Sequence, residues 1–204
     1  MAKLHFIFGS MGSAKTAYAL IRKYNHEQAG HLVWFIKPSI DTRDGDGVIK
    51  SRIRGLESKI QMVEPDENLL QEFKKFKLKP DIVIVEEVNF ITKKQVEQLR
   101  QIVNQTKTPV YCYGLRTDFK TNLFPASARL FELADSIEKI ESLCDCGQNE
   151  AIVNARKNVI GEVVIDGAQV VVGGDDIYQA MCHNCYTKAI KNAKKTEISG
   201  RSKP

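Results

Sequence analysis

Short strand-like runs alternate with longer amphipathic stretches along the first 143 residues of the chain. Apolar or alternating runs predict five β-strands, at residues 4–8, 32–36, 81–85, 109–114 and 136–143. Amphipathic stretches between them predict four α-helices, at residues 15–29, 65–79, 92–105 and 125–134. Strands that alternate with helices are typical of a parallel sheet covered by helices on both faces, so the expected fold class is α/β.

The pattern changes after residue 143. Short β-like pieces at 163–165 and 169–172 lie between two close pairs of cysteines, which indicates a small subdomain over residues 144–190. Residues 191–204 are polar and basic, and we expect them to form a flexible tail. Within the first domain, a polar and glycine-rich segment at 37–47 predicts a mobile loop.

Length and composition exclude several classes of protein. The chain has 204 residues, 43% of them hydrophobic, which is enough to bury a core and excludes a disordered chain. No apolar run approaches the ~18 residues that a membrane-spanning helix needs, so we expect no membrane partner. The N-terminus has neither the apolar segment nor the cleavage site of a secretory signal, and we expect a cytoplasmic protein.

The positive charge of the chain is concentrated at its C-terminus. The formal net charge is +5, and the segment from Lys188 onward contains six basic residues and one acidic residue, Glu197. The rest of the chain is therefore neutral overall. Because no aromatic residues lie between these charges to form a stacking surface, we expect no nucleic-acid partner.

Four of the five cysteines form two close pairs, Cys144 with Cys146 and Cys182 with Cys185. In a reducing compartment such pairs are metal ligands more often than disulfides. Four thiolates on two short turns can converge tetrahedrally on zinc, and such a closed site is structural. His183 is an alternative ligand, although Cys185 has the better spacing. The fifth cysteine, Cys112, lies in an apolar run and is expected to be a buried strand residue.

A glycine-rich segment, residues 9–16, joins the first predicted strand to the first predicted helix. It fits the phosphate-loop pattern G-x-x-x-x-G-K-[ST] at Gly9, Lys15 and Thr16, but Ala14 replaces the second glycine. Lys15 would neutralise the β- and γ-phosphates, and the Thr16 hydroxyl would hold Mg²⁺. The alternative is a structural turn with a solvent-exposed lysine. If Ala14 is already helical, its methyl group costs little; if Ala14 requires a positive φ, the strain costs about 1 kcal/mol or more.

Two glutamates, Glu86 and Glu87, follow the third predicted strand. Carboxylates at this edge of a parallel sheet face the ligand crevice, and in P-loop enzymes one of them positions Mg²⁺. Adjacent residues of a strand point in opposite directions, so we expect separate roles, one toward Mg²⁺ and one as a proton acceptor. The alternative is a pair of strand-end glutamates beside solvent.

Together these motifs resemble the type II thymidine kinases, and the bacterial members closely, from Leu4 to about Ala189. The matching segments are the loop 9–16, Lys37-Pro38, Asp41-Thr42-Arg43, Glu87 with Phe90, residues 113–119, both cysteine pairs, and Val172-Gly173-Gly174 with Tyr178. The resemblance implies a P-loop fold with a zinc-bound subdomain and a lasso-like lid. It also implies transfer of the γ-phosphate of ATP, with Mg²⁺, to the 5′-hydroxyl of thymidine or deoxyuridine.

The resemblance implies roles for individual residues. Glu87 corresponds to the general base. The implied nucleotide-binding residues are Gly9, Ser10, Met11, Gly12, Ser13, Ala14, Lys15, Thr16, Asp41, Arg43 and Glu86. The residues implied to enclose the nucleoside are Met11, Phe90, Leu115, Phe119, Phe124, Val171, Gly173 and Tyr178. The implied zinc ligands are Cys144, Cys146, Cys182 and Cys185.

The family further implies a homotetramer, with a dimer as the alternative, and feedback inhibition by dTTP. The sequence departs from the family pattern at Ala14, Glu86 and Asn89, where the family has glycine, aspartate and glutamine. The changes at 14 and 86 favour an alternative, a weakened or non-catalytic nucleotide-binding relative, whereas Lys15, Thr16 and Glu87 oppose it. A zinc-ribbon ATPase acting on nucleic acid is a further alternative, and the neutral body of the chain counts against it.

Overall fold

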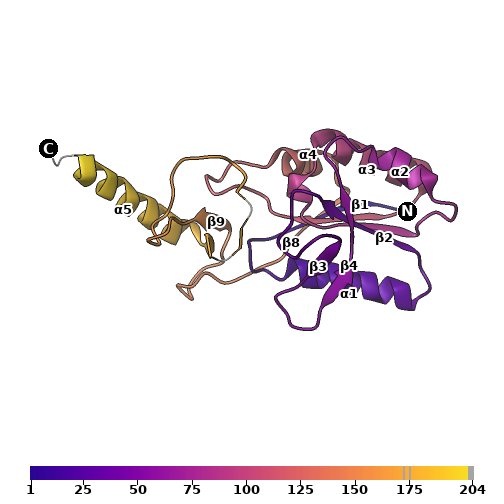
Figure 1. The fold of residues 1–204 in the computed structure, drawn as a ribbon, viewed down its shortest axis with the longest axis horizontal. Coiled ribbons are helices and arrows are strands. Elements are labelled where there is room, and N and C mark those ends of the chain that lie inside the picture. Colours follow the sequence, from indigo (N-terminus) through magenta and orange to yellow (C-terminus); the bar gives the residue numbers. More distant parts are fainter. Residues whose placement is uncertain (172, 175, 202–204) are drawn as a thin grey trace.

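The computed structural model describes residues 1–171, 173–174 and 176–201, and its larger part is a six-stranded parallel sheet between two layers of helices (Figure 1). In spatial order the strands are β5 (Gln61–Val63), β2 (Val33–Pro38), β6 (Ile82–Val85), β7 (Val110–Gly114), β1 (Leu4–Phe8) and β8 (Ser136–Lys139). One face is covered by α1 (Lys15–Gln28), and the other by α2 (Leu69–Lys75), α3 (Lys93–Thr106) and α4 (Pro125–Leu133). The expected α/β class is confirmed.

Two apolar clusters attach the helices to the sheet. In the central strand β6, Ile82 and Ile84 belong to the cluster that includes residues of α1, and Val83 and Val85 belong to the cluster that includes residues of α2, α3 and α4. Both faces of the strand are buried, which explains its uninterrupted apolar sequence. Cys112 of β7 is also fully buried, as predicted.

The strands differ from the prediction at their ends and in number. β8 ends at Lys139, four residues before the predicted end. The backbone N–H of Ile140 still donates to the Phe8 carbonyl at 2.8 Å, and the chain then leaves the sheet. The edge strand β5 and a two-stranded antiparallel hairpin were not predicted. This hairpin, formed by β3 (Val48–Lys50) and β4 (Glu57–Lys59), follows the loop expected at 37–47.

The helices begin where their capping residues allow. The stretch predicted as a helix at 65–79 is helical only over Leu69–Lys75, and the Asn68 side chain caps it by accepting the Gln71 N–H at 3.1 Å. Helix α3 begins directly after Thr92, which forms the predicted capping box with Gln95. Among the described residues, no helix is long and apolar enough to cross a membrane.

The remainder of the chain forms a smaller unit at one end of the sheet (Figure 1). Antiparallel strands β9 (Val153–Arg156) and β10 (Tyr178–Met181) precede helix α5 (His183–Arg201). Of the predicted β-like pieces, Val163 forms only an isolated bridge with Lys157, residues 169–171 are irregular, and residue 172 lies outside the described residues.

Helix α5 continues through residues 191–201, which belong to the segment expected to form a flexible tail. Lysine, arginine, alanine and glutamate, which have high helix propensity, make up six of the eleven residues 191–201, so a helix already started by the second cysteine pair can continue. Residues 202–204 lie outside the described residues.

Candidate functional site

A cavity of about 360 Å³ lies at the carboxyl ends of β1, β6 and β7. Its wall includes the phosphate loop after β1, the glutamate pair after β6 and the segment 115–119 after β7. The predicted residues that line it are Met11, Gly12, Ala14, Lys15, Thr16, Asp41, Arg43, Glu86, Glu87, Phe90, Leu115, Phe119, Phe124, Val171, Gly173 and Tyr178. Three predicted residues, Gly9, Ser10 and Ser13, support the loop from behind and are absent from the wall. This position matches the ligand crevice of open α/β sheets.

The phosphate loop is folded tightly against the sheet. A methyl group on Gly9 would lie 2.4 Å from Ser13 Oγ and 2.7 Å from the Ile140 carbonyl oxygen, so only glycine fits there. The ammonium group of Lys15 donates to the Ser10 carbonyl at 2.7 Å, inside the fold. Burial lowers the pKa of Lys15. The alternative of a solvent-exposed lysine is therefore wrong.

Ala14, the departure from the glycine pattern, has φ 63° and ψ 18°, which is left-handed backbone. Ala14 directly precedes α1, and its carbonyl accepts the Tyr18 N–H at 3.1 Å. Of the two conformations that the sequence left open, the structure adopts the strained one. Glycine is preferred in such a position because it has no Cβ.

The two glutamates after β6 both face the cavity. The Thr16 hydroxyl donates to Glu86 Oε1 at 2.6 Å, which brings together the hydroxyl and carboxylate predicted to hold Mg²⁺. Burial and the neighbouring charge of Glu87 raise the pKa of Glu86 to about 8. Hydroxyl and carboxylate oxygens are the ligand types that Mg²⁺ prefers, so this pair fits the ion.

Glu87 belongs to a chain of alternating charges. Arg43 donates from Nη2 to Glu87 and from Nε to Asp41 Oδ1 at 2.6 Å. Asp41 also lies near Lys37, whose Nζ is 3.6 Å from Asp41 Oδ2 and fully buried. Burial alone would raise the pKa of Asp41, but the hydrogen bonds and charge of Arg43 and the charge of Lys37 hold it below its ordinary value. The loop segment 41–43 is thereby attached to the cavity wall beside Glu87.

The other end of the cavity is apolar. The rings of Phe90 and Phe124 meet edge to face, with their centroids 5.8 Å apart, and Leu115 and Phe119 complete this wall. Residues 169–171 and 173–174 also line the cavity, and Gln169 donates to Asp118 Oδ2, next to Phe119, at 2.9 Å. The Tyr178 hydroxyl donates to the Val171 carbonyl at 2.9 Å and holds this segment in place. This is the segment for which the family resemblance implies a lid.

Several lining residues were not predicted. Asn154 of β9 accepts the Met11 N–H at 2.7 Å and so connects the small unit to the phosphate loop. Asp118, Gln169 and Arg52 also line the cavity. Asp118 could have been predicted, because it lies within segment 113–119, which carries the family resemblance. Asn154, Gln169 and Arg52 lie in no recognisable local motif.

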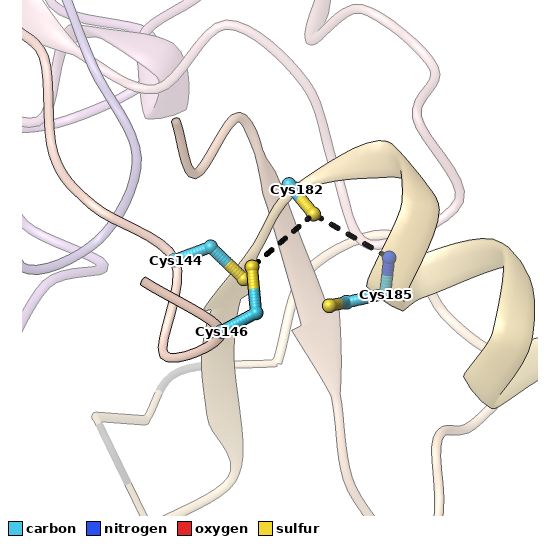
Figure 2. A group of neighbouring side chains, drawn as sticks. All are labelled: Cys144, Cys146, Cys182 and Cys185. Atoms are coloured by element: carbon cyan, nitrogen blue, oxygen red, sulfur yellow. Dashed lines mark hydrogen bonds between the residues drawn. The ribbon is translucent and has the colours of Figure 1, made fainter. Parts of the chain in front are cut away.

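The four predicted metal ligands form one cluster (Figure 2). Their sulfur atoms all lie within 4.8 Å of one another, and the Cys146 and Cys182 sulfurs are 4.0 Å apart. Tetrahedral zinc with Zn–S bonds of ~2.3 Å would place its sulfurs ~3.8 Å apart, so the cluster fits this ion. Gly147, with φ 68°, allows the first tight turn. His183 is exposed and lies outside the cluster.

Comparisons with known proteins agree with these motifs. The family model described as thymidine kinase matches residues 2–186. The thymidine kinase of Legionella pneumophila (strain Paris) is 39% identical over 191 residues, which cover 92% of this chain and 90% of that protein. The thymidine kinase of Rhodopirellula baltica is 36% identical to this chain, and the match covers 97% of this chain and 94% of that protein. The thymidine kinase of Pasteurella multocida is 37% identical, and the match covers 93% of this chain and 99% of that protein. Since these matches span nearly the whole length, the chain belongs to the thymidine kinase family.

Proposed function

We propose that this protein transfers the γ-phosphate of ATP to the 5′-hydroxyl of thymidine or deoxyuridine. The observation that carries the proposal is a single cavity with a phosphate loop, a pair of carboxylates and an aromatic wall. The phosphate loop suits a triphosphate, the carboxylates can accept a proton from an alcohol, and the aromatic wall fits a nucleobase. Family membership supports the same reaction.

On the phosphate side, the loop N–H groups and the start of α1 favour bound anions. Lys15 points into the fold next to this loop, where its charge would offset that of the β- and γ-phosphates. Thr16 and Glu86 would hold Mg²⁺, which when bound neutralises phosphate charge. Bound phosphates would also favour the charged form of Lys15, whose pKa is lowered by burial in the ligand-free protein.

On the acceptor side, Glu87 is the proposed general base for the 5′-hydroxyl. Glu87 lines the same cavity as the phosphate loop and the aromatic residues. Arg43 contacts the Glu87 carboxylate and also pairs with Asp41, so a positive charge is fixed close to the point of phosphoryl transfer. Positioning and neutralisation of charge are the main demands of this reaction on the protein.

The apolar end of the cavity is proposed to bind the base. Phe90, Phe124 and Leu115 would exclude water from it, and backbone groups of the lid would pair with the polar edge of the pyrimidine. The cysteine cluster is proposed to hold structural zinc. The metal would fix the chain directly before and after the region that carries the lid, because the two cysteine pairs bracket residues 147–181.

The test is a turnover assay with ATP, Mg²⁺ and a panel of labelled nucleosides. We expect thymidine and deoxyuridine monophosphates as products. Glu87→Gln should lower kcat by roughly 10²–10⁴-fold and leave thymidine binding nearly unchanged, because it removes the proton acceptor but keeps the shape. Glu138→Gln, on the exposed edge strand β8, is the matched control.

Two results would count against the proposal. Absence of monophosphate from wild-type protein that binds ATP would favour the non-catalytic relative. A Glu87→Gln variant with normal kcat would remove Glu87 from the role of base. The retained lysine, threonine and glutamates on one cavity favour catalysis over the non-catalytic alternative.

We further infer a homotetramer in the cytoplasm that is inhibited by dTTP. That nucleotide combines the base and the triphosphate for which the two ends of the cavity are suited. Inhibition that is competitive with both ATP and thymidine would support binding across the whole cavity, and inhibition competitive with neither would contradict it. Light scattering of the purified protein measures the oligomeric state.

A further inference from the structure

Arg156, the last residue of β9, is buried between the nucleoside wall and the lid. Its guanidinium carbon lies 3.8 Å from the centroid of the Phe119 ring. Nη1 donates to the Ala168 carbonyl at 2.9 Å, and Nη2 donates to the Asp166 carbonyl at 3.3 Å. Only 7% of the residue is exposed, and a cation–π contact is strongest when the cation is shielded from water. One side chain therefore joins a wall residue to the segment that leads into the lid.

Arg156 is also directly opposite Tyr178 in the antiparallel pair β9–β10. Tyr178 holds the Val171 carbonyl, while Arg156 holds the carbonyls at 166 and 168. Neighbouring side chains on the two-stranded ladder thus hold both ends of segment 166–171. The last two residues of this segment, Val170 and Val171, line the cavity.

The backbone beneath Arg156 is shaped to receive it. Gly167 has φ +131°, and a methyl group there would lie 2.5 Å from Arg156 Nη2. Gln169 donates to Asp118 Oδ2 at 2.9 Å, which adds a second link between the lid segment and the residues around Phe119. A residue larger than glycine at 167 would therefore displace the guanidinium group from the two carbonyls.

We propose that Arg156 is a positioning residue for nucleoside binding: it holds segment 166–171 against Phe119, so that the lid lies over the apolar end of the cavity. The proposal rests on the proposed function for the identity of the ligand, but its structural part concerns the ligand-free chain alone. Arg156 contacts the wall and the lid, and acts on the nucleoside only through them.

Two variants test the contact from opposite sides. Arg156→Met keeps the length and apolar stem but removes the hydrogen bonds and the cation. Gly167→Ala keeps Arg156 but displaces it. In hydrogen-exchange measurements on ligand-free protein, we expect both variants to exchange the amides of residues 166–171 faster than wild type, by about tenfold, which corresponds to the loss of one or two such contacts.

Steady-state kinetics then separate positioning from general damage. The KM for thymidine should rise by about tenfold in both variants, while the KM for ATP and the zinc content stay at their wild-type values. Arg156→Lys should restore the KM for thymidine only in part, because an ammonium group cannot contact the Phe119 ring and bind both carbonyls at the same time. Arg129→Met, which removes a surface guanidinium paired with Glu97 and Glu132 on α3 and α4, is the control.

Unchanged exchange at 166–171 in either variant that folds would overturn the proposal. So would an equal rise in the KM for both substrates, which indicates a general structural role. If wild-type protein fails to phosphorylate thymidine while the exchange rates change as expected, the proposed function fails and the positioning role of Arg156 stands.

Discussion

Replacing Ala14 with glycine should stabilise the protein. Ala14 has φ 63° and ψ 18°, and such left-handed backbone costs a residue with a Cβ roughly 1–2 kcal/mol. Glycine avoids this cost, but its greater freedom in the unfolded chain offsets roughly 0.4–1 kcal/mol of the gain. We therefore expect the free energy of unfolding to rise by about 0.5–1 kcal/mol, equivalent to ~2 °C in Tm for a chain of this size.

Urea denaturation and a thermal scan of the ligand-free protein measure this change. The matched control is Ala17→Gly, three residues further on inside α1, which should lower stability by about 1 kcal/mol because that residue is helical and buried. Because Ala14 is already left-handed before nucleotide binds, the affinity for ATP should not change. If Ala14→Gly destabilises the protein as much as Ala17→Gly does, the strain argument is refuted.

Three further substitutions test other parts of the structure. Cys182→Ser should release zinc and lower Tm, and metal analysis showing full zinc content would contradict the ligand assignment. Glu86 has a pKa of about 8 in the folded protein against an ordinary value of 4.5, so the folded state holds this proton more tightly. The stability of the metal-free, nucleotide-free protein should therefore fall as the pH rises from about 5 to 8, by at most ~1.4 kcal/mol per pH unit, and Glu86→Gln should flatten the curve measured by urea denaturation. Gly114→Ala would place a methyl group 2.6 Å from Asn89 Oδ1 and 2.9 Å from Val88 Cγ1, and should cost about 1–3 kcal/mol; a wild-type Tm would show that this contact can relax.

Strands buried on both faces could be predicted from the sequence, whereas the two edges of the sheet differ: β8 was predicted from its alternating sequence, although with a later end, and β5 was not predicted. The run 82–85 is apolar throughout because helices cover both faces of β6. In contrast, β5 has three residues, with exposed Gln61 and buried Val63 at its ends, so it gives no periodic signal. The hairpin β3–β4 is equally short, and Ile49 is the one buried residue among its two described strands. Strand β5 and the hairpin β3–β4 therefore depend on the neighbouring strand or loop for their conformation.

The residues of the candidate site also fall into a group that could be predicted from the sequence and a group that could not. The phosphate loop and cysteine pairs are local motifs, because their chemistry requires fixed spacing within a few residues. Asn154 and Arg156 contact residues 143 and 12 positions away, Met11 and Ala168, and nothing in their immediate sequence shows it. Such contacts follow from where β9 lies relative to the phosphate loop and to segment 166–171, which is a property of the tertiary structure.

The orientation of Glu87 shows how a small backbone change determines the chemistry of the site. In a continuing strand, Glu86 and Glu87 would point to opposite sides. β6 instead ends at Val85, and Glu87 has φ 47° and ψ 40°, left-handed backbone that starts the short 3₁₀ helix Val88–Phe90. This turn brings the second carboxylate into the same cavity as the first, where Arg43 holds it. The strain of a non-glycine residue in this conformation, roughly 1–2 kcal/mol, is the cost of placing the proposed proton acceptor and the proposed Mg²⁺-binding carboxylate next to each other in one pocket.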